Sequence, residues 1–235
     1  MRVTVVSLKR SLDRREEIEK QLLNLNINFD FFDAIDGNED NFLNSNLAAP
    51  EITYKRKGYN LLHSEIACFS SHLEIWKLCV QKDEPFIVLE DNVNINPEFA
   101  RVISSLGAYL ERYEYIKLSA TKKSQFKSID SVCANFQLVK YCKNTRGTTG
   151  YIITPSAAEK FILGAQNIIE PVDDYMEKAW RHNVECVHVQ PDIVTRSGKK
   201  STIFHNRKNK QKIPLTKKIY IEIFRVYEFI QRNTK

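Results

Sequence analysis

The chain has 235 residues, of which 43% are hydrophobic and 27% charged, and its formal net charge at pH 7 is +6. This composition supports one sizeable core and excludes a disordered chain, and no uncharged apolar run reaches the roughly 18 residues that a membrane-spanning helix needs. The five cysteines form no CxxC pair or zinc-ligand spacing, and the apolar run near Met1 is too short for a signal peptide, so we expect a cytoplasmic protein.

The N-terminal segment alternates between strand and helix patterns. Residues 4–8 predict a strand. Ser11 and Asp13 then predict the start of a helix, with Glu16 completing a capping box. Residues 28–32 predict a second strand, so this segment is expected to form a β-α-β unit.

A turn and a long irregular segment follow. Asp and Gly residues at 33–37 predict a turn at the exit of the second strand. Residues 38–60 have no clear period and are rich in Asn, which predicts a long loop that could cover a site. In residues 64–82 the apolar positions recur at spacings of three and four, which predicts a largely buried helix.

The next segment carries the most informative pattern of the chain. Residues 86–89 are strongly apolar and predict a buried strand, which ends on Glu90, Asp91 and Asn92. In open α/β sheets, ligands bind beyond the carboxyl ends of strands, where oxygen atoms can meet a cation that carries phosphates. An ordinary turn explains the same three residues, because Asp and Asn are common turn formers.

The remaining body continues the alternation. The sequence predicts a helix at 97–112 and strands at 115–118 and 150–154, and Ser156 with Glu159 predicts a second capping box. This alternation favours an α/β fold. The chain has no GxGxxG, P-loop or GxSxG motif, so the usual dinucleotide, ATPase and hydrolase signals are missing.

Positive charge is concentrated at the C-terminus. Residues 199–235 hold eleven Lys and Arg against two acids, a net charge of +9, so the preceding body carries −3 and is not expected to bind nucleic acid. After Pro214, residues 215–235 alternate apolar and basic positions with helical spacing, which predicts a basic amphipathic helix. Such a helix could lie on an anionic inner leaflet or simply dock on the body. We therefore divide the chain into a domain at 1–205 and a tail at 206–235.

Several blocks of sequence, taken in order, resemble a known family. The blocks at 5–15, 32–37 and 65–91 resemble glycosyltransferase family 25, the lipooligosaccharide biosynthesis enzymes related to collagen galactosyltransferases. Later blocks at 150–153, 171–176 and 201–203 extend the resemblance over nearly residues 1–205. It implies a GT-A fold, which is a nucleotide-sugar-binding α/β fold with a central mixed sheet flanked by helices. The implied chemistry is inverting transfer of a hexose, commonly galactose from UDP-galactose, here to a bacterial lipooligosaccharide or LPS core acceptor.

The resemblance also implies a divalent metal, expected to be Mn²⁺. The family's usual Glu-Asp-Asp motif is Glu90-Asp91-Asn92 in this chain. We expect Asp91 to be the leading metal or ribose-phosphate ligand and Asn92 the second. The amide oxygen of Asn92 can bind a hard cation but brings no charge, so we expect weaker metal binding or partial replacement of the metal by basic residues. Glu90 either contacts the donor or faces the fold.

Donor-binding residues follow from the same blocks. Arginines would favour a diphosphate, while each of these positions also has a structural explanation as a helix start, turn, packed histidine or strand entrance. The candidates are Ser7, Leu8, Arg10, Arg14, Asp36, Ser71, His72, Glu90, Asp91, Thr149, Gly150 and Tyr151, with Thr148 beside them.

The catalytic base is expected in the Pro-Val-Asp block. Asp173 could accept the proton of the acceptor hydroxyl, and Asp174 is its near competitor. Asp173 could instead cap the following helix. Two other functions stay open at this point. Asn92 would suit a catalytically silent protein that binds a UDP-sugar, and the basic tail alone would allow sequence-blind binding of nucleic acid.

Overall fold

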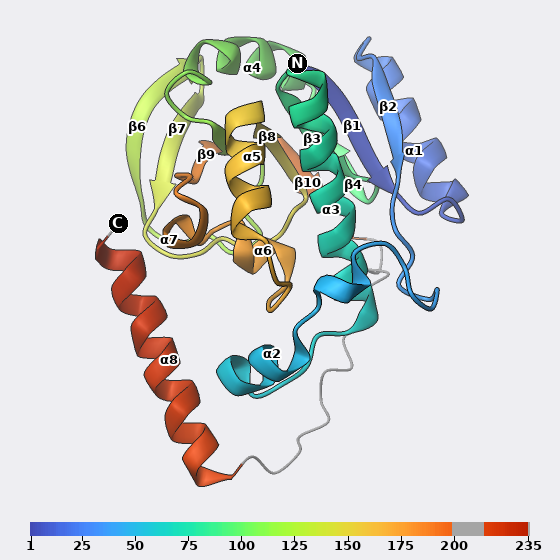
Figure 1. Cartoon of the computed structure of the whole chain (residues 1–235). Coiled ribbons are helices and arrows are strands. Elements are labelled where there is room, and N and C mark those ends of the chain that lie inside the picture. The colour runs from blue at the N-terminus through green and yellow to red at the C-terminus, as the bar shows by residue number, and fades with distance from the viewer. Residues whose placement is uncertain (199–213, 235) are drawn as a thin grey trace.

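The computed structural model describes residues 1–198 and 214–234, and it is built around a mixed sheet of eight strands (Figure 1). The strands lie in the order β2-β1-β3-β8-β5-β9-β7-β6, and a separate two-stranded sheet pairs β10 with β4. Their bounds are β1 Arg2–Ser7, β2 Phe29–Asp33, β3 Phe86–Glu90, β4 Val93–Ile95, β5 Tyr115–Lys117, β6 Phe126–Cys133, β7 Phe136–Tyr141, β8 Gly150–Ile153, β9 Val187–Gln190 and β10 Val194–Arg196.

The directions of the strands determine which loops meet. β1 runs parallel to both β2 and β3, so the carboxyl ends of these three strands lie at one edge of the sheet. β8 runs antiparallel to β3 and pairs Gly150 with Leu89, so it begins at the same edge. The backbone N–H of Glu90 donates to the carbonyl oxygen of Thr149 at 3.1 Å, which joins the loop before β8 to the end of β3.

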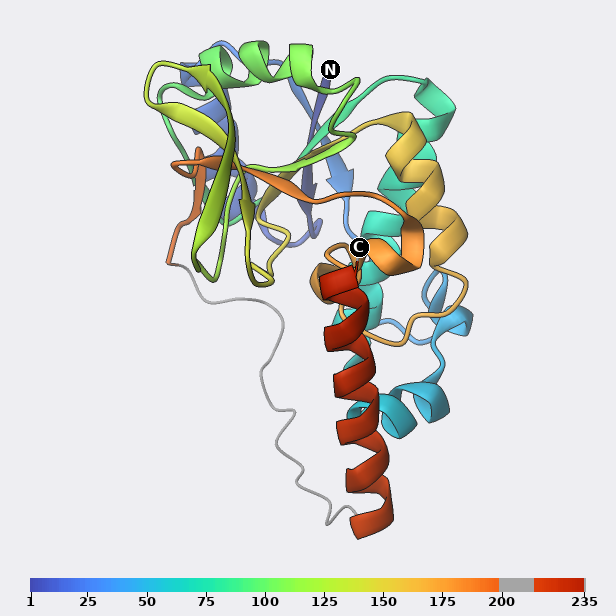
Figure 2. The same cartoon turned by 90° about the vertical axis from the view of Figure 1, so that its left-hand side faces the viewer.

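Helices cover both faces of the sheet (Figures 1 and 2). The central strand β3 is apolar on both sides because each side meets a different helix layer: Ile87 and Leu89 join the core with α1 and α4, while Phe86 and Val88 join the core with α3 and α5. The helices are α1 Leu12–Asn24, α2 Pro50–Lys57, α3 His63–Lys82, α4 Phe99–Leu106, α5 Pro155–Gly164, α6 Val172–Tyr175, α7 Ala179–His182 and α8 Leu215–Thr234, with short 3-10 turns η1 Ser45–Leu47 and η2 Gly107–Tyr109.

The expected architecture, a central mixed sheet flanked by helices, is confirmed. The β-α-β unit formed by β1, α1 and β2 is present, as are the long helix α3 and the strands β3, β5 and β8. The helix expected at 97–112 is shorter, because α4 ends at Leu106 and passes into η2.

Three local predictions are wrong. The segment at 38–60 is not one long loop, because α2 begins at Pro50, which suits a first helical turn, and ends at Lys57, where Gly58 with φ 77° caps it. The Ser11 side chain makes no capping hydrogen bond to α1. At α5 the helix begins two residues earlier than expected, and the Thr154 hydroxyl accepts a hydrogen bond from the N–H of Ala157 in place of a Ser156 capping box.

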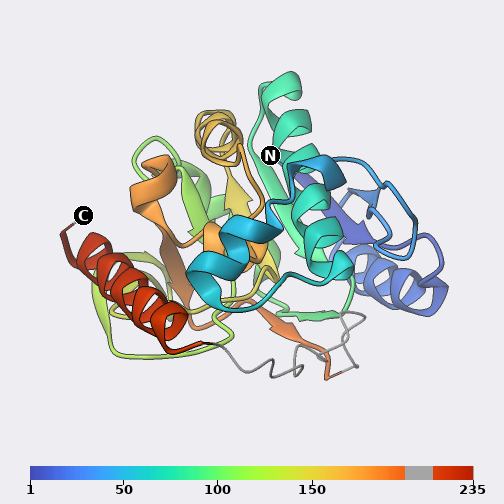
Figure 3. The same ribbon diagram turned by 60° about the horizontal axis from the view of Figure 1, so that its bottom comes forward.

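The helix α8 lies against the same end of the molecule as α2 (Figures 1 and 3). The guanidinium of Arg56 packs on the ring of Phe224 and the ammonium of Lys55 on the ring of Tyr220, while Ile221 is buried at 5% exposure. Within residues 1–198 and 214–234, no helix combines the length and apolar content that crossing a bilayer requires. The block at 201–203 and the basic residues of 199–213 lie outside the described residues.

Candidate active site

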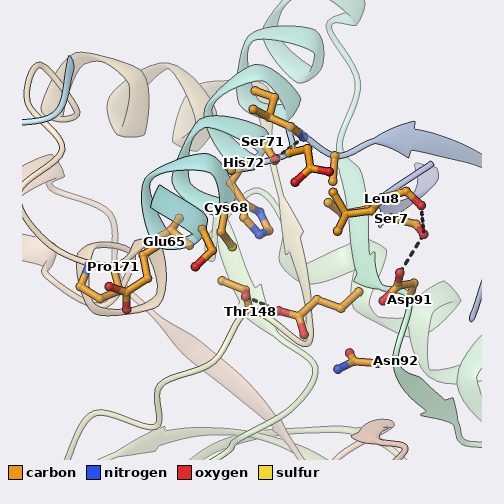
Figure 4. A pocket seen from close by; sticks show the side chains of 18 of the residues that line it. Ser7, Leu8, Glu65, Cys68, Ser71, His72, Asp91, Asn92, Thr148 and Pro171 are labelled. Carbon is orange, nitrogen blue, oxygen red and sulfur yellow. Dashed lines mark hydrogen bonds between the residues drawn. The ribbon is translucent and has the colours of Figure 1, made fainter. Parts of the chain in front are cut away.

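A cavity of about 870 Å³ lies at the sheet edge where β1 and β3 end (Figure 4). Its walls come from the loops after β1, β2 and β3, from the first three turns of α3, from the loop before β8, from the start of α6 and from the end of β10. These segments are far apart in sequence, and the sheet topology brings their polar side chains together.

Asp91 is fixed at this edge by β1 and α1. Its Oδ2 accepts a hydrogen bond of 2.7 Å from the Ser7 hydroxyl, and its Oδ1 lies 3.4 Å from Nη1 of Arg14. Ser7 is in turn held by Arg15, whose Nη2 donates to the Ser7 carbonyl oxygen at 2.8 Å and to Asp33 at 2.6 Å. The Asp91 carboxylate therefore has a defined orientation with one guanidinium beside it.

The neighbours of Asp91 differ in their contacts. Glu90 faces the cavity, and its carboxylate accepts a short hydrogen bond from the Thr148 hydroxyl. Burial raises the pKa of Glu90, which the Thr148 hydrogen bond and Arg196 only partly oppose. The side-chain oxygen of Asn92 is buried, and it has no hydrogen-bond partner among the described residues. It is thus an acceptor oxygen whose capacity is unused.

The loop after β2 closes another wall of the cavity. The N–H of Ile35 donates to the Ser71 hydroxyl at 2.9 Å, which ties the loop to α3. Gly37 touches the start of α3 so closely that a Cβ there would lie 2.8 Å from backbone atoms of His63 and Ser64. Beside it, Arg10 forms an ion pair with Asp36, so these two donor candidates meet across the cavity mouth.

His72 is oriented by two aromatic side chains. Its Nδ1 lies 2.8 Å from the Tyr151 hydroxyl, which also accepts a hydrogen bond of 3.2 Å from Nε1 of Trp76. Because the Tyr151 oxygen already accepts from Trp76, its own proton is free to go to Nδ1, which leaves the His72 proton on Nε2. Burial lowers the pKa of His72 to about 4, so the ring is neutral and offers one N–H at the cavity wall.

Asp173 is held on the opposite wall. Its Oδ2 accepts a hydrogen bond of 3.0 Å from the N–H of Gly147, and its Oδ1 accepts one of 3.0 Å from the N–H of Asp174. Gly147 has φ 78°, a conformation that favours glycine. Asp173 is the second residue of α6 and does not cap it, because Pro171 occupies the capping position.

Asp174 points away from the cavity. Its Oδ2 lies 3.1 Å from Nζ of Lys57 and 3.2 Å from Nζ of Lys178. Burial acts to raise the pKa of Asp174, but the two lysines lower it to about 2. A carboxylate that binds protons so weakly is a poor general base, so the geometry favours Asp173 over its neighbour.

The structure brings most of the sequence candidates to the cavity and leaves four outside its lining, which are Asp174, Thr149, Gly150 and Tyr151. The carbonyl oxygen of Thr149 accepts a hydrogen bond from the N–H of Glu90, and Gly150 packs on Leu89 and Val194. The hydroxyl of Tyr151 contacts Nδ1 of His72. The candidates that line the cavity are Ser7, Leu8, Arg10, Arg14, Asp36, Ser71, His72, Thr148, Glu90, Asp91, Asn92 and Asp173.

Among the cavity residues that were not singled out from the sequence as site residues are Glu65, Cys68 and Arg196. Glu65 accepts a hydrogen bond from the N–H of Leu62 at 3.0 Å and so caps α3, although it lies in the block that resembles the family. Cys68 has a pKa raised mainly by burial, so its thiol stays protonated. Arg196 ends β10, and the β-branched run Ile193–Thr195 before it was the available signal.

The residues present fit a divalent cation that also binds phosphate. The candidate ligands are all oxygens, which hard cations such as Mg²⁺ and Mn²⁺ prefer, and the unused oxygen of Asn92 is directly beside Asp91. No group of three or more His, Cys, Asp or Glu residues within the described ranges could hold a metal ion by itself. A cation here would therefore need oxygens from a bound diphosphate to complete its shell.

Comparisons with known proteins point to one family. Residues 1–176 match the family model described as "Glycosyltransferase family 25 (LPS biosynthesis protein)". The chain is 25% identical over 168 residues to the lipooligosaccharide biosynthesis protein lic2B of Haemophilus influenzae, a match that covers 66% of this chain and 60% of that protein. It is 27% identical over 187 residues to procollagen galactosyltransferase 2 of Homo sapiens, covering 74% of this chain and 29% of that protein.

A solved structure is also similar. It is a glycosyltransferase involved in the glycosylation of the major capsid of PBCV-1, with a TM-score of 0.44 and 10% identity over 96% of this chain and 100% of that chain. The chain thus spans less than two thirds of the length of the two curated relatives named above.

The raised pKa of Glu90 makes a prediction about stability. A carboxyl group whose pKa is higher in the folded state stabilises the fold while it is protonated, and that contribution is lost as the pH rises through the folded-state pKa. At pH 7, well above the ordinary carboxyl pKa, the folded wild type has lost stability that it has in acid because burial disfavours the charged carboxylate, and Glu90→Gln is expected to increase the free energy of unfolding by on the order of 1 kcal/mol or more.

Denaturant unfolding at pH 7 and at about pH 4 checks this prediction. Below the ordinary carboxyl pKa of 4.5 the advantage of the variant should vanish. Glu111→Gln, at an exposed position, serves as the control and should change stability little at either pH. A variant less stable than the wild type at pH 7 would contradict the assignment.

Proposed function

The chain belongs to glycosyltransferase family 25, and from this premise we propose that it transfers a hexose, most simply galactose from UDP-galactose, to a lipooligosaccharide or LPS core acceptor. The observation that carries the proposal is the pairing of Asp91 with Ser7 and Arg14 at the edge of an 870 Å³ cavity, opposite Asp173. The name of the human relative, a procollagen galactosyltransferase, supports galactose as the donor sugar.

The donor diphosphate would bind beside Asp91. Arg10, Arg14 and Arg196 all line the cavity, and guanidinium groups match phosphate oxygens well. Asp91 and Asn92 would hold a divalent cation, which when bound would neutralise charge on the leaving diphosphate. The neutral His72 would donate its Nε2 proton to a donor oxygen. Glu90, held by Thr148, would accept a hydrogen bond from a sugar or ribose hydroxyl.

Transfer would be a single displacement with inversion. The acceptor hydroxyl oxygen attacks C1 of the hexose as its proton passes to the Asp173 carboxylate, and the bond from C1 to the diphosphate oxygen breaks, releasing UDP. The two backbone N–H groups of Gly147 and Asp174 hold Asp173 in the orientation for this role. Asp91 follows β3, and Asp173 lies at the start of α6 beside Pro171, which Figure 4 shows across the cavity from Asp91. This supports an arrangement in which leaving group and base flank the reacting carbon.

We also propose that the protein works on the cytoplasmic face of the inner membrane, held there by α8. One stripe of this helix points away from the body at helical spacing, and each member is at least 50% exposed: Leu215, Ile219, Ile223, Val226 and Ile230. Lys218 and Arg225 are exposed beside the stripe, as expected for contact with anionic lipids. Docking on the body and binding a membrane are therefore compatible, because they would use opposite faces of α8.

The central test is a panel of UDP-sugars assayed for UDP release with a delipidated lipooligosaccharide core as acceptor. We expect release from UDP-galactose by the wild type. Asp173→Asn should bind UDP normally but lose about 10²- to 10⁴-fold in kcat, because only the base is removed. Asp91→Ala should lose donor binding and transfer while it remains folded. A wild type that binds UDP without releasing it from any donor would instead be a silent UDP-sugar-binding protein.

The metal assignment predicts the effect of added charge at position 92. Asn92→Asp should bring a second carboxylate to the cation and lower the Mn²⁺ concentration for half-maximal binding about tenfold in the presence of UDP, measured by calorimetry. Asn94→Asp, two residues along on the exposed side of β4, adds the same charge outside the cavity and should leave Mn²⁺ binding as in the wild type. Equal Mn²⁺ affinity in all three proteins would remove Asn92 from the metal site.

The membrane assignment predicts that charge in the stripe abolishes binding to vesicles. Ile223→Glu should reduce sedimentation with phosphatidylglycerol vesicles at least tenfold, because it places a carboxylate in the apolar contact. Thr216→Glu adds the same charge at an exposed polar position of α8 and should have a much smaller effect. If both variants lose binding equally, net charge rather than the apolar stripe controls the association.

A further inference from the structure

A cluster of buried charges outside the cavity joins α8 to the body. The side chain of Lys178 is 2% exposed and that of Lys57 is 14% exposed, and both meet the carboxylate of Glu228 from α8, at 2.5 and 3.3 Å. The same two lysines contact Asp174, and both also contact Glu170, whose side chain is 2% exposed. Three carboxylates thus surround two ammonium groups, and Arg181 pairs with Glu170 at 2.8 Å.

Formal charges balance in this cluster only with α8 in place. Lys57, Lys178 and Arg181 supply three positive charges, and Glu170, Asp174 and Glu228 supply three negative ones. Buried charges are costly unless they are paired, so removing Glu228 would leave a net positive charge beside a fully buried lysine. Asp174 would then be the nearest partly exposed carboxylate able to move and compensate.

Asp174 cannot move without affecting Asp173. The two residues are adjacent in α6, a helix of four residues, and the N–H of Asp174 donates to Oδ1 of Asp173. The other oxygen of Asp173 is held by the N–H of Gly147, in the loop before β8. A shift of Asp174 toward the lysines would therefore change the hydrogen bonds that orient the Asp173 carboxylate in the cavity.

We propose that Glu228 is a positioning residue for sugar transfer, which acts through Lys57, Lys178 and Asp174 on the orientation of Asp173. The proposal rests on the role of Asp173 as the base. It gives α8 a second task besides contact with a membrane: the inner face of the helix completes the charge cluster that supports the acceptor side of the cavity. The donor side, built by β1 and β3, shares no residue with this cluster.

The test compares Glu228→Gln with Glu222→Gln. Both remove one carboxylate from α8, but Glu222 is 64% exposed, and among the described residues its one ion pair is with the equally exposed Arg225 of its own helix. With UDP-galactose and the delipidated core, and without vesicles, Glu228→Gln should lower kcat about tenfold or more with KM for UDP-galactose unchanged. Glu222→Gln should match the wild type in both constants.

A second measurement does not depend on activity. Amide hydrogen exchange at Gly147 should be slow in the wild type and in Glu222→Gln, and faster in Glu228→Gln, because that N–H donates to Asp173. Unchanged exchange at Gly147 together with unchanged kcat in a folded Glu228→Gln variant would overturn the inference, as would an equal effect of both variants. If no protein releases UDP yet exchange still changes, the proposed reaction fails while the positioning link stands.

Discussion

The parallel pairing of β1 with β3 is the constraint on which the site depends. It brings Ser7 and Asp91, 84 residues apart in the chain, within 2.7 Å of each other. The antiparallel entry of β8 beside β3 then brings Thr148 to Glu90. Because each of these strands is buried on both faces, a change of register would move every core side chain to the wrong layer. The strand register that buries the core therefore also fixes the positions of the polar residues at the edge.

The sequence predicts the part of the fold in which apolar periodicity is strong. Residues 64–82 and 86–89 form the expected helix and strand, because a long two-faced apolar pattern has few alternatives. The hairpin of β6 and β7 could not be recognised, since β6 is mostly exposed and its register is interrupted twice. The loop prediction for segment 38–60 was wrong for a different reason. The helix α2 is short and only one of its residues is buried, so it has no clear pattern of apolar residues in the sequence.

The candidate site was predictable where residues leave a strand end and unpredictable where it depends on long-range contacts. Asp91 was proposed from such a strand end together with the family resemblance, and Asp173 from the Pro-Val-Asp block of that resemblance. Asp173 and Asp174 are distinguished by the ion pairs of Asp174 with Lys57, which lies on the distant helix α2, and with Lys178, four residues further along the chain. Tyr151 was expected to touch the donor because its block resembles the family, but its hydroxyl lies 2.8 Å from Nδ1 of His72, a contact that depends on the packing of α3 on the sheet.

The two faces of α8 interact through different forces, and added salt changes the strength of these interactions in opposite directions. Its inner face is held partly by cation–π contacts and surface charges such as those of Lys55 and Arg56, which added salt screens. Its outer stripe is apolar, and strongly hydrated salts such as sulfate strengthen apolar association. In such salts the contacts between the inner face of α8 and the body would be weaker, and binding of the outer stripe to other apolar surfaces would be stronger. The salt in a purification buffer would therefore influence which face of α8 is bound.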